Sequence, residues 1–138
     1  MTTQDRATHS AAYLAWGHAG LFGAIALACY LSPETVFGSA AWLPLARLAV
    51  LLFAAALMAS AIALVGSARS GSLKQIRLAL IAAITIDAQV PILAFSQPAS
   101  LEYLEHDLGI PWFIVPLLFV LIVGVTVALL PRAAATRS

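Results

Sequence analysis

Long apolar runs separated by short polar segments dominate the chain. Four runs stand out, at residues 12–31, 42–66, 77–95 and 112–130. Each is close to the roughly 20 residues that a helix, rising 1.5 Å per residue, needs to cross about 30 Å of hydrocarbon. Because unpaired backbone groups are costly in lipid, each run is expected to be helical. The pattern predicts an all-α fold: a single domain, residues 1–138, forming an integral membrane four-helix bundle.

Basic and acidic residues lie at opposite ends of the predicted spans. The basic residues near span ends are Arg6, Arg69, Lys74, Arg77, Arg132 and Arg137. The other two loops have no Lys or Arg and contain Glu34, Glu102, Glu105 and Asp107. Because cytoplasmic loops are enriched in Lys and Arg, both termini and the central loop are predicted to be cytoplasmic, and the acidic loops outside. We expect the protein to lie in the cell membrane, specifically in a bacterial inner membrane.

The connecting segments differ in their local signals. In the last outer loop, Ser100 is suited to cap a helix over residues 101–108, and Gly109 to end it. This pattern predicts a short helix along the membrane surface, and residues 32–34 start a similar signal in the first outer loop. Residues 67–72, Ser-Ala-Arg-Ser-Gly-Ser, predict a short flexible turn.

Composition excludes several classes of protein. Hydrophobic residues make up 62% of the chain and charged residues 9%, which leaves too little polar surface for a soluble domain. The net charge of +1, without any Lys-rich or Arg-rich block, argues against binding of nucleic acid. Cys29 is the only cysteine, which excludes an intrachain disulfide and a dithiol redox pair. The lipid bilayer is therefore the expected partner.

Small residues recur every four positions on the first two predicted helices. They are Gly20, Ala24 and Ala28 on the first and Ala55, Ala59 and Ala63 on the second. Such stripes let helix backbones approach closely. Packing within the chain is the favoured interpretation, and contact with a second copy or with a larger membrane complex is the alternative.

Asp87 is the most informative polar residue, because it lies near the middle of the third predicted span. An ionised carboxylate is expensive in hydrocarbon, so it is expected to face protein or water and to mark a functional site. At 100° per residue, its face of the helix also holds Leu80, Ala83, Val90 and Pro91. Thr85 and Gln89 point to the opposite side, and both sides are expected to face other helices.

Two residues are candidate partners of Asp87. His18 lies about 5 Å to the cytoplasmic side of the middle of the first predicted span. Helical side chains lean toward the N-terminus, so His18 and Asp87 lean in the same direction and can meet if their helices are neighbours. Arg47 lies about 10 Å outside the middle of the second span, so a pair with Asp87 requires helix tilt or an intervening water. Both pairings stay open.

These polar residues support a functional and a structural interpretation. In the first, Asp87 and His18 are candidate catalytic residues that exchange a proton, and Arg47, Asp87, Gln89 and His18 are candidate ligand-binding residues. In the second, they form a hydrogen-bonded network that fixes helix register. No cofactor is identified. No metal site is expected either, since the outer cluster Glu102, Glu105, His106 and Asp107 matches no strong metal motif.

Three functions follow from this set. The leading hypothesis is a binding or accessory subunit that holds a lipophilic ligand or a partner helix around the polar site. The second is a membrane-embedded enzyme, such as an isomerase or a subunit of a quinone-linked oxidoreductase, with Asp87 and His18 as acid and base. The third is a small proton-coupled transporter in which Asp87 carries the proton.

In size and in its four-span plan, the chain resembles two broad groups, the small multidrug resistance transporters and the DoxX-like membrane proteins. The resemblance is one of architecture. Proton-coupled exchange in the transporter group depends on a membrane-embedded glutamate in the first span, where this chain has His18 and no glutamate. The similarity to the DoxX-like group has no discriminating motif.

Overall fold

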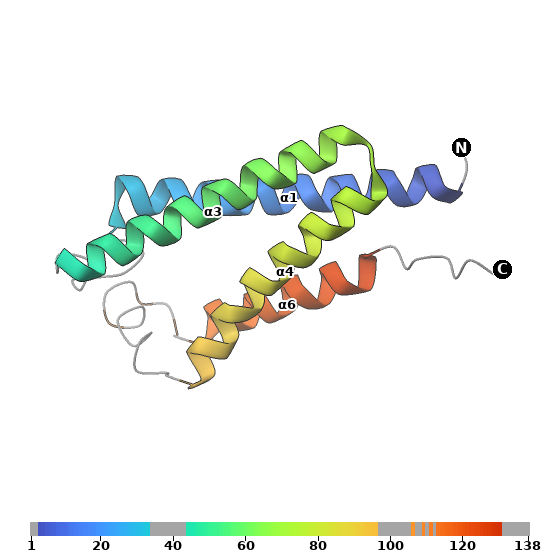
Figure 1. Ribbon diagram of the computed structural model, residues 1–138. Helices are drawn as coiled ribbons and strands as arrows, with labels where there is room; N and C mark the ends of the chain where they lie inside the picture. Colours follow the sequence, from blue (N-terminus) through green and yellow to red (C-terminus); the bar gives the residue numbers. More distant parts are fainter. Residues whose placement is uncertain are drawn as a thin grey trace.

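The computed structural model describes residues 3–33, 44–96, 106, 109, 111 and 113–130. Within these residues the regular structure is entirely α-helical, which confirms the predicted all-α class. Four helices follow one another along the chain, and Figure 1 shows their arrangement. They are α1 (Thr3–Leu31), α3 (Pro44–Ser70), α4 (Leu73–Ser96) and α6 (Ile114–Leu129).

The helices extend beyond several of the predicted boundaries. The polar residues from Thr3 onward continue α1 ahead of its apolar run, and α3 continues to Ser70. The predicted turn over residues 67–72 is therefore too long, and only Gly71 and Ser72 connect α3 to α4. Gly71 adopts a φ of 68°, a left-handed conformation that suits glycine after a helix. The surface helices expected in the two outer loops lie outside the described residues, apart from single positions.

Serine side chains explain why α3 continues through its polar end. The hydroxyl of Ser67 donates to the carbonyl oxygen of Leu64 at 2.9 Å, and the hydroxyl of Ser70 donates to that of Ser67 at 2.7 Å. These bonds satisfy the hydroxyl groups inside the helix. The serine-rich composition that predicts a turn is thus compatible with a last helical turn.

Three helical segments are long and apolar enough to cross a membrane, which suggests a membrane protein. They are Asp5–Leu31, Arg47–Ser70 and Leu73–Ile92. Helix α6 is apolar but shorter, with 16 residues and a length of about 24 Å. Large apolar side chains are more than half exposed on all four helices, including Leu31, Ile62, Leu78 and Leu121. Exposed apolar surface on this scale suits contact with lipid.

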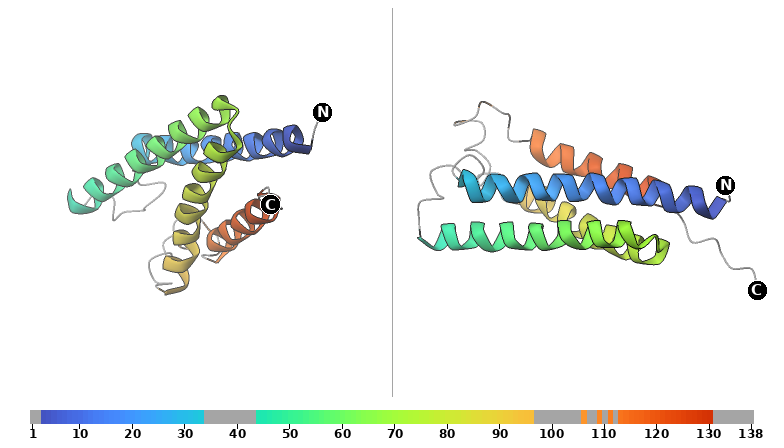
Figure 2. Two further views of the ribbon diagram at one scale, coloured as in Figure 1. Left: turned by 45° about the vertical axis from the view of Figure 1, so that its right-hand side comes forward. Right: turned by 90° about the horizontal axis from the view of Figure 1, so that it is seen from above.

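Helices α1 and α3 run antiparallel and side by side along much of their length (Figures 1 and 2). Their buried residues on α1 are Ala11, Ala15, His18, Ala19, Phe22, Ala26 and Cys29, and on α3 Val50, Ala54, Leu57, Ala61 and Leu64. Spacings of three and four residues are those of helices that cross at about 20°. Small alanines at this seam let the two backbones approach closely.

The predicted small-residue stripes do not form this seam. Gly20, Ala24, Ala55, Ala59 and Ala63 are exposed, and Ala28 is half-buried. Within the described residues these exposed positions give no support to packing within the chain, and contact with a second copy or with a larger membrane complex stays a prediction. Helix α1 carries a second set of small residues on the face that packs in the core, namely Ala11, Ala15, Ala19 and Ala26.

Helices α4 and α6 form the second half of the fold. Helix α4 contacts both α1 and α3, while α6 packs mainly along α4 and touches α1 only slightly. In the left view of Figure 2, α6 lies beside α4 on the side away from α3. Only Pro116 and Thr126 are buried on α6. This loose contact between α1 and α6 leaves space next to the polar residues of the core.

Candidate functional site

The structure joins the imidazole of His18 on α1 to the carboxylate of Asp87 on α4. The distance between Nε2 of His18 and Oδ2 of Asp87 is 3.0 Å, within hydrogen-bonding range. The side chain of His18 is 6% exposed and that of Asp87 is 0% exposed. Of the two pairings that the sequence leaves open, this is the one the structure contains.

Asp87 reaches His18 because it lies on the buried face of α4. This face consists of Ile76, Leu80, Ala83, Asp87 and Pro91, again at spacings of three and four residues. The predicted set of residues on the same face as Asp87 is thus confirmed, with Val90 half-buried at its edge. His18 occupies the equivalent core position on α1, between Ala15 and Phe22.

The local surroundings fix the orientation of the imidazole. Nδ1 of His18 lies 3.1 Å from the carbonyl oxygen of Leu14, one helical turn earlier. The ring of Phe22 approaches that of His18 edge-on, with centroids 6.1 Å apart and planes at 86°. His18 is therefore held at both nitrogens and at one ring edge, and its contact with Asp87 follows from this orientation.

Asp87 has an unused oxygen. Its Oδ1 is buried and receives no hydrogen bond from the residues that the structure describes. A buried acceptor without a donor is costly, so such a group often marks the place of a water or of a ligand. Pro91 lies on the same face one turn later and has no backbone N–H to donate.

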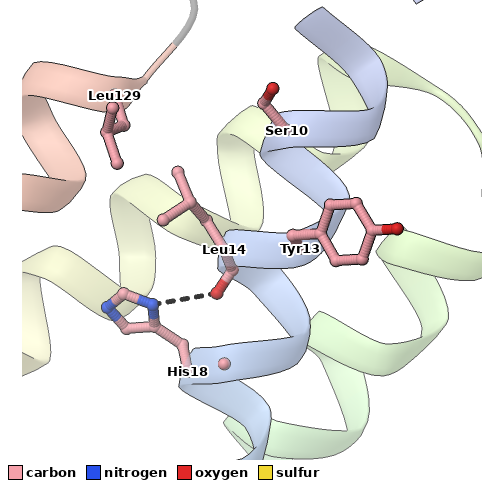
Figure 3. Close-up of a pocket in the computed structure, with 6 residues that line it drawn as sticks. Ser10, Tyr13, Leu14, His18 and Leu129 are labelled. Atoms are coloured by element: carbon pink, nitrogen blue, oxygen red, sulfur yellow. Dashed lines mark hydrogen bonds between the residues drawn. The ribbon is translucent and has the colours of Figure 1, made fainter. Parts of the chain in front are cut away.

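A pocket opens between α1 and α6 beside this pair. It has a volume of about 420 Å³ and is lined by Ser10, Tyr13, Leu14, Gly17, His18 and Leu129. Figure 3 shows the imidazole of His18 reaching past the α1 backbone toward the side of Leu129, with the ring of Tyr13 pointing away. A Cβ at Gly17 would meet no other atom within 4 Å. The lining is thus mostly apolar, and His18 is the lining residue that contacts the buried carboxylate of Asp87.

Two predicted ligand-binding residues lie apart from the pair. Gln89 is exposed, and its amide donates to the carbonyl oxygen of Thr85 at 3.4 Å. The hydroxyl of Thr85 donates in turn to Ile81 at 2.9 Å, so the expectation that this side of α4 faces another helix is wrong within the described residues. Arg47 is exposed near the start of α3 and takes no part in the ion pair of Asp87.

The sequence pattern predicts neither the pocket nor the edge-on contact of Phe22 with His18. The pocket residues on α1 follow a helical spacing, at positions 10, 13, 14, 17 and 18, and Gly17 is the small residue among them. That spacing is visible in the sequence, but the facing residue Leu129 comes from a helix about 110 positions later. Phe22 lies one turn from His18, a position that the sequence also shows.

An imidazole and a carboxylate in direct contact can bind, hold and release a proton. A scan against protein-family models, a search of curated proteins and a search of solved structures each give no match to this chain.

Proposed function

We propose that the protein is an integral protein of the cell membrane that crosses it four times, with both termini in the cytoplasm. Three apolar helices of sufficient length support three of the spans, and the shorter apolar helix α6, about 24 Å long, is our proposed fourth span. The distribution of basic residues supports the orientation. Arg69 also lies 5.7 Å from the ring of Trp16, which brings a basic and an aromatic residue together at the proposed cytoplasmic end.

This orientation is tested with single cysteines in a Cys29→Ala background. Ser70→Cys, at the end of α3, is expected to resist a membrane-impermeant maleimide in intact spheroplasts and to react after the membrane is opened. Ser100→Cys, in the acidic loop between α4 and α6, is expected to react in intact spheroplasts. The opposite pattern, or equal reaction at both positions before the membrane is opened, would contradict the proposal.

We further propose that the pocket between α1 and α6 binds a neutral lipophilic molecule. The observation that carries this proposal is that His18 both lines the pocket and contacts the buried Asp87. The pocket volume of about 420 Å³ lies within the range of small-molecule sites, roughly 300–1,000 Å³. Its lining combines apolar side chains with a few polar groups, which is typical of such sites.

Charge favours an uncharged ligand. The lining residues include no Lys, Arg, Asp or Glu. A charged group of a ligand would therefore find no oppositely charged side chain among these four residue types in the pocket lining. Asp87 is already paired with His18 and is fully buried. The hydroxyl of Ser10 donates to the carbonyl oxygen of Arg6 at 3.0 Å, and its oxygen can still accept a hydrogen bond from a neutral polar end such as an alcohol.

The test is thermal unfolding in detergent with a panel of lipophiles. A long-chain alcohol, a sterol and a short-chain quinone are compared with a fatty acid and an alkylammonium ion of matched length. At about 100 times its Kd, a bound ligand adds about 2.7 kcal/mol to the free energy of unfolding. At least one neutral compound is expected to raise the Tm, and the charged compounds are not.

Two glycine variants locate the effect. Gly17→Leu places a side chain in the pocket and is expected to abolish the shift. Gly20→Leu adds the same side chain to the same helix outside the pocket lining, and is expected to keep it; a Cβ at either position meets no atom within 4 Å. If no neutral compound stabilises the protein, or if both variants respond equally, ligand binding in this pocket is wrong.

The contact between His18 and Asp87 favours a second candidate function, an enzyme that acts on the bound lipophile. In this proposal the pair serves as acid and base, because its members are in contact and one of them lines the pocket. Turnover of a ligand found in the stability screen, lost in Asp87→Asn while binding is kept, distinguishes the enzyme from the binding protein.

A further inference from the structure

We infer that His18 and Asp87 together bind one exchangeable proton, held between Nε2 and Oδ2, and that this proton exchanges through the pocket between α1 and α6. The inference concerns the same pocket as the proposed function but requires no ligand. It therefore stands or fails separately from the proposed lipophile.

Nδ1 of His18 carries a hydrogen. It lies 3.1 Å from the carbonyl oxygen of Leu14, and a carbonyl oxygen only accepts hydrogen bonds. Nδ1 must therefore carry hydrogen and donate it to Leu14. In a neutral imidazole one nitrogen carries hydrogen and the other does not, so Nε2 of a neutral His18 is an acceptor.

The contact between Nε2 of His18 and Oδ2 of Asp87 requires a hydrogen between the two atoms. If His18 is neutral and Asp87 is ionised, two acceptors face each other at 3.0 Å with no hydrogen between them, and both are buried. One added proton removes this conflict. It gives either an imidazolium that donates to a carboxylate or a carboxylic acid that donates to a neutral imidazole. The two arrangements have the same number of protons, so the contact indicates one bound proton in either case.

No other buried titratable group among the described residues lies close enough to compensate the charge of Asp87. The buried faces of α3 and α6 contain no titratable side chain among the described residues. On α1 the other buried titratable group is Cys29, about 16 Å from His18 along the helix axis. On α4 it is Arg77, whose Nε is buried without a partner in the described residues, about 15 Å from Asp87. The shared proton is thus the local compensation for the charge of Asp87.

The proton reaches the pair through the pocket. Asp87 is fully buried, whereas His18 lines the pocket. A transient rotation of the imidazolium breaks its hydrogen bonds to Leu14 and Asp87 and turns Nε2 toward the pocket, where the N–H bond breaks and the proton passes to the oxygen of a water molecule. His18 is left neutral and Asp87 as a carboxylate, and uptake reverses these steps. The pocket is therefore the entrance to the proton site.

The site is tested by ¹⁵N NMR of histidine-labelled protein in detergent, with His9→Gln and His106→Gln so that His18 is the remaining histidine. We expect Nδ1 to carry hydrogen throughout and one pH-dependent step to appear at Nε2 or at the carboxyl stretch of Asp87 in the infrared spectrum. In Asp87→Asn the amide can donate to Nε2, so His18 is expected to stay neutral and the step to disappear. An unprotonated Nδ1, or an unchanged step in Asp87→Asn, would overturn the inference.

The route is tested by hydrogen–deuterium exchange of the shared proton. Gly17→Leu fills the pocket and is expected to slow exchange by about tenfold, which corresponds to about 1.4 kcal/mol of added barrier. Gly20→Leu is expected to exchange at the wild-type rate. Because both glycines have open space around a Cβ, these variants test the inference even if Asp87→Asn does not fold. Equal rates in the two variants would contradict the route.

Discussion

The substitution His18→Leu is expected to lower the free energy of unfolding by about 2–4 kcal/mol, because it leaves Asp87 buried without a partner. Asp87 is 0% exposed, and its Oδ1 already lacks a donor among the described residues, so loss of the imidazole leaves both oxygens without compensation. Leucine fills most of the space of the imidazole, so loss of packing contributes less than loss of the pair. Reversible unfolding in mixed micelles with increasing SDS measures the change.

The pair allows a complete double-mutant cycle. Asp87→Val alone is expected to cost about 1–2 kcal/mol, since it leaves Nε2 of a neutral imidazole buried without a hydrogen-bond partner. The double variant His18→Leu with Asp87→Val is expected to be close to wild type, because replacing both members of a buried pair by apolar residues is often neutral. Additive losses in the double variant would show that the two side chains do not stabilise each other, and that their contact has no energetic role.

The sequence predicts His18 and Asp87 as members of the site, but it does not determine that their side chains are in contact. A carboxylate within a long apolar run identifies Asp87, and the helical period identifies Leu80, Ala83 and Pro91 as its neighbours on the same face. Depth arguments make contact with His18 plausible, yet they depend on where each helix begins. Counted over residues 12–31, His18 lies about 5 Å from the middle of the span, whereas counted over the candidate span Asp5–Leu31 it lies at the midpoint, so the depth of His18 depends on which residues are counted.

Helix contacts were harder to predict, because α1 has two faces made of small residues. One contains Gly20 and Ala24, and the other contains Ala15 and Ala26. Both satisfy the rule that small residues allow close approach, and no feature of the isolated helix states which of them meets α3. In the structure, the face that holds Ala15, His18 and Phe22 is the buried one. The exposed stripes are left as candidate contacts with lipid or with a partner helix.

The pocket lies beyond what a sequence pattern determines. Its residues on α1 are a helical series, but Leu129 lies opposite them only because α6 packs along α4 and barely touches α1. That arrangement depends on the relative positions of three helices. The chain has no local signal for it. Polarity alone predicts Arg47 and Gln89 as members of the site, because it does not show which helix face is buried.

Phe22 contributes the largest buried side chain beside the pair, and Phe22→Ala is expected to lower the free energy of unfolding by about 3 kcal/mol. The ring is 1% exposed and contacts the imidazole of His18 edge-on, so its removal leaves a cavity at the seam and frees one edge of His18. Unfolding in SDS mixed micelles measures the loss, with Leu27→Ala as the control because Leu27 lies on the same helix and is 52% exposed.

The control separates core packing from contact with lipid. Lipid or detergent can replace the exposed atoms of Leu27, whereas no such molecule reaches the site of Phe22, so Leu27→Ala is expected to change stability by less than about 1 kcal/mol. Phe22→Leu keeps an apolar side chain at the seam and is expected to recover much of the loss. If Phe22→Ala and Leu27→Ala are equally mild, α1 does not pack through the face that carries His18. The carboxylate of Asp87 would then require another partner.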